Sequence, residues 1–436
     1  TVEGIEPELH AFSIVVDGEP ALTMKVEPGT TSSQIYDSEA FLNFMDTFNY
    51  NQSCGFFADE ELLEVIDPTE NFVVDAPINI YTKMAKQTET ELVLPISQTS
   101  LDASVIKNNG IQDVVLPSSW TAISSSQFED CSSLKTINIH NNIQSIGGAA
   151  FRKAGLERLV IKHNLTVGNG TFHRCDNLRY VYWNSNLDST GNSYTQQLLF
   201  ANCKIDTFII GKDVEVFDDD SALNEGANYY GGLTYMLPIK ELIYEDSTKS
   251  VQDSTDYHEG FLMAENITIN DQNRFDSLNG TKNAYWNMQY FANYLYYAEN
   301  FGNFYIKDTI EGADNFTVKE PNLSGYYGID GEVTLTKVTS DRAGYIKYVL
   351  DYESPVATIY LDGQELTKLK VTSARLVQDV YLSDYFGDVQ ISGPFLDADA
   401  MTVAGASDYI TDGMKLYYFT ATTDELDISY ERVYGE

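Results

Sequence analysis

The chain has 436 residues, which is enough for about three domains of ordinary size. Its formal net charge is −38, from 65 acidic and 27 basic side chains. This charge excludes nucleic acid and anionic membrane surfaces as expected partners, because both are polyanionic. No apolar run is long enough to span a bilayer, so we expect no membrane insertion.

The first 85 residues predict a small sheet with a helix across it. Residues 12–16 and 22–26 alternate like strands around Asp17-Gly18-Glu19-Pro20, a turn-forming cluster that predicts a hairpin. Apolar residues then recur at helical spacing over 41–48, behind Ser38 as a candidate N-cap.

Two motifs complete this N-terminal region. They are the segments Cys54-Gly-Phe-Phe-Ala-Asp59 and Ile78-Asn-Ile-Tyr-Thr-Lys-Met84. Together they resemble the B-repeat of listerial internalins, which has the consensus G-W-Y-x-D followed by L-Y-A-K-W. Phe56 stands where that family has Trp, and Met84 stands for its final Trp. The resemblance implies a β-grasp-like spacer over residues 1–90, of a kind found beside repeat domains on bacterial surfaces.

Residues 111–210 repeat a six-residue strand motif with apolar residues at positions one, four and six. A second motif, which ends in Phe, lies between the first copies of the strand motif, and the period is roughly 22 residues. Such a short unit cannot bury its own apolar face, so the copies must stack as a solenoid of parallel strands. The strand motif begins at Ile111, Leu134, Leu156, Leu178 and Ile205, and the second motif ends at Phe128, Phe151 and Phe172.

The repeat predicts two buried columns. The three Phe side chains should line up, and a small buried site after each ring should hold Cys131, Ala154, Cys175 and Cys203 in turn. We expect four free, buried thiols in the chain, although Cys175 and Cys203 on neighbouring rungs leave a disulfide open.

This pattern resembles the BspA-type leucine-rich repeat, with Leu116-Pro117, Ile146-Gly147, Ala150-Phe151 and Cys131-Ser-Ser-Leu134 as the closest pieces. The resemblance implies a right-handed solenoid, placed here at 91–310, in bacterial, protist or phage-borne surface proteins. It also implies adhesion or recognition without an active site. Degenerate later rungs are expected from Ile239 and around Ile267.

Residues 311–436 predict a β-sandwich or jelly roll, because short strand-like runs recur at intervals of roughly ten residues. The sandwich could bind sugar or mediate oligomerisation, but we favour a cap on the solenoid end. The Tyr-rich segment 285–305 is expected to be core rather than a ligand platform. The clearest strands are 332–338, 344–350, 356–361 and 414–419, with a hairpin turn at Asp362-Gly363.

Sequence motifs for catalysis or metal binding are absent or weak. His173 and Cys175 are close soft ligands, but no second pair stands at zinc spacing, and we expect His173 to point outward. The acidic turns at 217–220 and 397–399 lack the ligand spacing of a calcium loop. No nucleophile elbow, phosphate loop or dinucleotide fingerprint appears. We therefore expect a mainly β, non-enzymatic protein without cofactor or metal.

The leading hypothesis is a surface-exposed recognition or adhesion protein, at the extracellular cell surface, that holds a protein or glycan on a host or neighbouring surface. A bacteriophage fibre or capsid decoration protein at the virion surface, contacting host or mucus glycans, is the second. An enzyme with its centre in 300–436 is the third, and homo-oligomerisation stays open. The ligand-binding residues predicted from strand alternation are Thr136, Asn138, Arg158, Val160, Tyr180, Tyr182, Thr207 and Ile209.

Overall fold

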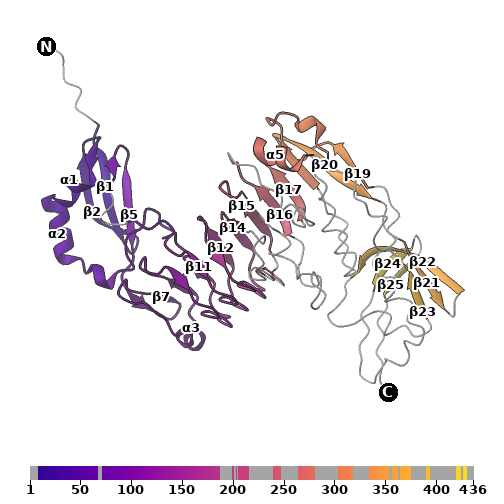
Figure 1. The fold of residues 1–436 in the computed structure, drawn as a ribbon, viewed down its shortest axis with the longest axis horizontal. Coiled ribbons are helices and arrows are strands. Elements are labelled where there is room, and N and C mark those ends of the chain that lie inside the picture. Colours follow the sequence, from indigo (N-terminus) through magenta and orange to yellow (C-terminus); the bar gives the residue numbers. More distant parts are fainter. Residues whose placement is uncertain are drawn as a thin grey trace, which may run out of the picture. The chain divides into compact units, whose positions relative to one another are not determined.

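In the computed structural model the chain forms two compact units, Thr1–Ser185 and Asn186–Glu436. Strands predominate among the described residues and the helices are few and short (Figure 1), which confirms the mainly β fold class. The structure describes residues 8–66, 71–186, 199–200, 203, 205–215, 239–246, 264–279, 303–317, 333–352, 356–361, 364–374, 389–392, 419–423 and 426–429.

Unit 1 begins with the predicted hairpin. Strands β1 (His10–Val16) and β2 (Glu19–Val26) pair antiparallel, and Val16 faces Glu19 across a two-residue turn. Asp17 and Gly18 both have positive φ, 52° and 86°, as the turns that suit a twisted hairpin require. On the other side of β1, β5 (Ile78–Thr82) pairs with it in parallel, so the sheet order is β2-β1-β5.

The predicted helix is also confirmed. Helix α2 (Glu39–Thr47) begins after Ser38, whose hydroxyl accepts a hydrogen bond from Phe41 N at 3.2 Å. Phe41 packs with Phe12 and the other buried residues of this sheet. In the described part of the chain, no helix has the length and apolarity to cross a bilayer. The remaining short elements here are β3 (Thr30–Thr31), α1 (Ser32–Tyr36), η1 (Tyr50–Gln52), β4 (Val73–Val74), β6 (Lys86–Gln87) and α3 (Ser104–Asn109).

The repeats of unit 1 form two walls of short parallel strands. One wall pairs β7, β8 and β10 in register and then β12 with β14, while the other pairs β9, β11 and β13. The apolar residues of the strand motif are buried in every copy between Ile111 and Ile210, except Ile137, which is half-buried. The strands are β7 (Glu91–Val93), β8 (Asp113–Val115), β9 (Ala122–Ile123), β10 (Thr136–Ile137), β11 (Ser145–Ile146), β12 (Arg158–Ile161), β13 (Thr166–Val167) and β14 (Tyr180–Trp183).

The predicted Phe column is confirmed. Phe128, Phe151 and Phe172 are fully buried, and their rings stack at centroid distances of 5.2 and 5.4 Å with interplanar angles of 12° and 9°. The small site after each ring is buried as well, and the four cysteines, all within the described residues, are buried thiols that form no disulfide. Stacking of rungs therefore buries what no single repeat can bury alone.

The N-terminal sheet and the first rungs share unit 1 because backbone hydrogen bonds join them. Ile96 N donates to Ser53 O at 2.7 Å, and Ser118 N donates to Cys54 O at 2.8 Å. Gly55 lies between these contacts at φ +97°, and a Cβ there would stand 2.0 Å from Ser118 Oγ. Glycine is required here because the φ is positive and a Cβ would overlap the Ser118 side chain.

The described residues of unit 2 include four parallel strands of the same kind, and β16 and β17 confirm the degenerate rungs expected near Ile239 and Ile267. The inward residues Phe208, Leu242, Ile267 and Phe304 follow one another in register and are all buried. The elements are β15 (Thr207–Ile210), β16 (Ile239–Tyr244), β17 (Ala264–Ile269), α5 (Gln272–Leu278), β18 (Asn303–Lys307) and η3 (Ala313–Asn315).

Residues 332–338 and 344–350, which we expected in the C-terminal sandwich, form strands that join the sheet of the last rung. The strands there, β19 (Val333–Val338) and β20 (Tyr345–Tyr352), form a hairpin, and β20 pairs antiparallel with β18. A last parallel strand leaves an edge of unpaired backbone groups, and an antiparallel strand satisfies them. Arg342, between β19 and β20, donates two hydrogen bonds of 2.8 Å to the carboxylate of Glu241 and lies 3.7 Å from the Tyr305 ring centroid.

The last described strands form one antiparallel sheet in the order β23-β21-β22-β24-β25. A second facing sheet is not among the described residues, so the sandwich stays a prediction. The predicted turn at Asp362-Gly363, the run 414–418, most of the Tyr-rich segment and the acidic turns at 217–220 and 397–399 lie outside the described residues. The strands are β21 (Val356–Leu361), β22 (Gln364–Ala374), β23 (Val389–Ser392), β24 (Phe419–Thr423) and β25 (Leu426–Ser429).

Candidate functional site

One wall of unit 1 presents a row of outward side chains that we call the strand face. Glu91, Asp113 and Thr136 lie side by side, because β7, β8 and β10 pair in register. Arg158 likewise faces Tyr180 across β12 and β14. The row changes along the solenoid from carboxylates to an aromatic ring. The strand face comprises Glu91, Asp113, Thr136, Arg158, Val160, Tyr180 and Tyr182.

A groove of about 330 Å³ lies between the strand face and the loop of residues 60–63. The loop follows the B-repeat-like motif of the N-terminal region, so the two walls of the groove come from different parts of the sequence. The groove is lined by Glu60, Glu61, Leu62, Leu63, Lys83, Glu91, Asp113, Val114, Val115, Thr136, Ile137, Asn138, Arg158 and Val160.

The loop is held in a defined conformation by Asp59. Its carboxylate accepts hydrogen bonds from the backbone N–H groups of Leu63 and Glu64, at 2.7 and 3.2 Å. Leu62, at φ 58°, takes the left-handed conformation that a bulky residue adopts only where its surroundings impose it. The Leu62 side chain is buried with Val93 and Val115, which fixes the loop on the solenoid.

Asn138 joins the loop to the rungs. Its side-chain amide donates to Leu62 O at 3.1 Å and Leu116 O at 3.2 Å, and its oxygen accepts from Leu116 N at 2.6 Å. The side chain is only 7% exposed. The expectation that Asn138 points outward is therefore wrong, because the loop covers this position and bonds to its amide.

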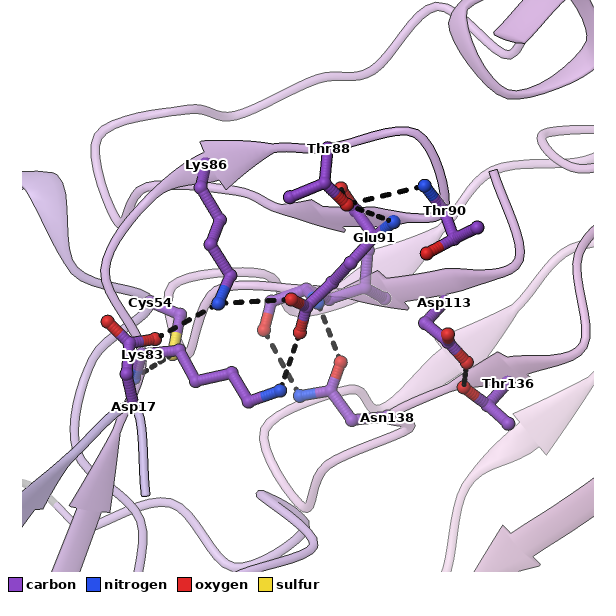
Figure 2. Close-up of polar contacts among 11 residues, drawn as sticks. Asp17, Cys54, Lys83, Lys86, Thr88, Thr90, Glu91, Asp113, Thr136 and Asn138 are labelled. Carbon is purple, nitrogen blue, oxygen red and sulfur yellow. Dashed lines mark hydrogen bonds and ion pairs between the residues drawn. The ribbon is translucent and has the colours of Figure 1, made fainter. Parts of the chain in front are cut away.

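Two lysines neutralise one end of the groove. Lys83 Nζ lies 2.6 Å and Lys86 Nζ lies 3.0 Å from the two carboxylate oxygens of Glu91, and Lys86 also reaches Asp17 at 3.4 Å (Figure 2). Burial alone would raise the pKa of Glu91, but the hydrogen bonds from both lysines outweigh it and lower that pKa. Glu91 therefore stays ionised and paired.

The other end of the groove carries a second ion-pair group. Arg158 Nη2 lies 3.1 Å from Glu61, and Lys162 Nζ lies 2.9 Å from Asp59 and 3.8 Å from Glu61. The Arg158 guanidinium also lies 5.1 Å from the centroid of the Tyr180 ring. Burial would lower the pKa of Lys162, but the hydrogen bond to Asp59 and the negative charges of Asp59, Glu61 and Glu64 together outweigh burial and raise that pKa.

Two groove carboxylates are left without a cation. Among the residues that the structure describes, no Lys, Arg or His forms an ion pair with Glu60 or Asp113. Asp113 accepts a hydrogen bond from the hydroxyl of Thr136, which is neutral (Figure 2). The groove thus has a surplus of negative charge between two neutralised ends.

The remaining predicted binding residues alternate as expected. Thr136 and Arg158 are exposed, Val160, Tyr180 and Tyr182 are half-buried, and the residues between those of β12 and β14 are buried. Thr207 and Ile209 show the same alternation on β15, in unit 2. Their role in binding stays a prediction.

Sequence reasoning missed the groove. Glu60, Glu61 and Lys83 belong to the N-terminal region, and Glu91 and Asp113 stand on rungs that were not assigned to the binding surface. The acidic run Asp59-Glu60-Glu61, which begins at the last residue of the Cys54–Asp59 motif, was the available signal. Its position over the first rungs depends on tertiary contacts.

Metal or thiol chemistry gains no support from the described residues. Within them, no group of three or more His, Cys, Asp or Glu side chains is arranged to hold a metal ion. His173 is half-buried rather than fully outward, and burial lowers its pKa to about 4. Burial raises the pKa of Cys54 and raises that of Cys131 to about 11, opposite to what a nucleophilic thiol requires.

Comparison with known families matches the repeats. Residues 99–225 match the BspA type leucine rich repeat region in six copies. The resemblance expected from the sequence is confirmed for this segment. BspA-type repeats are typical of surface-exposed proteins that bind other proteins or mediate adhesion. No curated protein and no solved structure matches the chain.

Proposed function

We propose that this chain is a non-enzymatic, surface-exposed adhesion or recognition protein that holds a protein partner on the strand face of its BspA-type repeats. The observation that carries the proposal is the row of parallel strands in register, with Tyr180, Tyr182 and Val160 half-exposed beside the charged groove. An aromatic and aliphatic centre with a polar rim is the composition expected of a protein interface.

The flanking regions fit the same role. We propose that residues 1–90 form a B-repeat-like spacer, which the β2-β1-β5 sheet with its crossing helix supports. We also propose a β-sandwich or jelly-roll domain within residues 311–436, which the antiparallel sheet β23-β21-β22-β24-β25 supports, and an extracellular, cell-surface location. The surplus of acidic side chains suits this location, because it keeps copies of the chain soluble and apart.

The test compares two double variants for binding to an array of extracellular and cell-surface proteins, printed together with glycans. Tyr180→Ser with Tyr182→Asn removes the aromatic centre of the strand face without changing charge. Ala122→Ser with Thr166→Asn, at exposed positions of β9 and β13, is the matched control on the other wall. Both variants should fold like the parent protein.

We expect the tyrosine variant to lose at least tenfold in affinity for a bound protein, because truncating anchoring aromatic residues typically costs more than about 1.4 kcal/mol. The control should bind like the parent protein. Equal binding by both variants rules out this surface, and binding to glycans alone replaces the protein partner by a carbohydrate.

A further inference from the structure

The groove between residues 60–63 and the strand face has the features of a specific subsite. Its volume of about 330 Å³ is at the lower end for binding pockets, so it suits one or two side chains rather than a folded element. Arg158 and Val160 line the groove and also belong to the strand face. A chain segment that lies along the strand face can therefore place one side chain in the groove.

The charges decide which side chain fits. Glu91 is paired with Lys83 and Lys86, and Glu61 is paired with Arg158 and Lys162. These ion pairs lie at the two ends of the groove and fix its cations. Glu60 and Asp113 remain, one on each wall, with no cationic partner among the described residues. An anionic or apolar side chain placed there would leave both carboxylates uncompensated.

We propose that the groove receives a lysine or arginine side chain of the protein partner, held between Glu60 and Asp113. This inference rests on the proposed function, since it takes the partner to lie along the strand face. A guanidinium or ammonium group offers several N–H donors to both walls, and charge-assisted hydrogen bonds of this kind are the stronger ones. The net charge of −38 also favours the approach of basic surfaces.

The test uses hexapeptide libraries in which one position is fixed as Arg, Lys, Gln, Leu or Glu. The parent chain should bind the Arg and Lys libraries at least tenfold more tightly than the Gln library. Glu60→Gln with Asp113→Asn keeps the shape of the groove and the acceptor for Thr136, and it should abolish this preference. Glu27→Gln with Glu39→Gln removes the same charge from exposed positions of the N-terminal region and should retain the preference.

Three results would overturn the proposal. One is a parent chain without preference for basic residues, and another is an equal loss in both charge variants, which indicates general attraction to a polyanion. The third is calcium binding by the parent chain, in the absence of peptide, that the groove variant alone abolishes, because the groove is then a cation site.

The strand-face variant separates this inference from the function on which it rests. If Tyr180→Ser with Tyr182→Asn weakens partner binding while the groove variant keeps the Arg and Lys preference, the groove subsite is wrong and the strand face stands. If the groove variant loses the preference while the tyrosine variant binds the partner normally, the proposed surface is wrong and the subsite stands.

Discussion

Phe151→Ala is the most direct test of the stacked rungs. Phe151 is fully buried between two parallel rings, Phe128 at 5.2 Å and Phe172 at 5.4 Å. Truncation of a buried Phe to Ala costs about 3 to 5 kcal/mol through lost transfer energy and the cavity left behind. Each aromatic pair adds about 0.5 to 1.5 kcal/mol beyond the area it buries. We therefore expect the free energy of unfolding to fall by at least about 4 kcal/mol.

Urea denaturation followed by far-ultraviolet circular dichroism measures this change. Leu42→Ala is the control, because Leu42 is 52% exposed on α2 and its truncation should change the free energy of unfolding by no more than about 0.5 kcal/mol. A loss below about 1 kcal/mol for Phe151→Ala would falsify the continuous core, since truncations in well-packed interiors cost more.

Double-mutant cycles test the order of the column. Strand β11 lies between β9 and β13, so Phe151 separates Phe128 from Phe172. The pairs Phe128–Phe151 and Phe151–Phe172 should each show a coupling free energy of about 0.5 to 1.5 kcal/mol. Phe128→Ala and Phe172→Ala, which act on rings that touch only through Phe151, should instead show a weaker coupling than either neighbouring pair. Coupling of the outer pair as strong as that of neighbours contradicts the stack.

Two further predictions concern the junction of the N-terminal region and the rungs, where Gly55 lies and where the buried His140 ring contacts the Phe57 ring at a centroid distance of 5.8 Å. Gly55→Ala should lower the free energy of unfolding by about 3 kcal/mol, because the φ is positive and the new Cβ clashes with Ser118. Gly18→Ala is the control and should cost about 1 kcal/mol, because Gly18 has a positive φ but no atom within 4 Å of the new Cβ. Equal urea midpoints for the two variants would contradict the close contact at Gly55. Burial lowers the pKa of His140 to about 4, below the value of about 6.5 in the unfolded chain, so the unfolded state binds more protons and stability falls as the pH drops from 6.5 towards 4. His140→Gln should reduce the fall in the free energy of unfolding between pH 7 and pH 5 by about 2 kcal/mol, measured by urea denaturation at both pH values. The same fall in the variant and the parent protein would show that His140 titrates normally.

Predictions from the sequence succeeded where neighbouring residues or repeated rungs determine the structure. Asp17 and Gly18 make a tight turn, and Ser38 caps the helix that follows it. The spacing of Phe128, Phe151 and Phe172 determines a column, because identical units can bury their apolar residues only by stacking. The outward alternation of Arg158, Val160, Tyr180 and Tyr182 follows from the same register.

Tertiary structure alone decided which outward residues remain available. Asn138 has the sequence position of a ligand-binding residue, but a loop from elsewhere in the chain covers it and bonds to its amide. The groove between Glu60 and Asp113 arises from the same contact. Periodicity reports which side of a strand a residue occupies. It carries no information on a segment that packs against that side from many residues away, because such packing depends on long-range contacts.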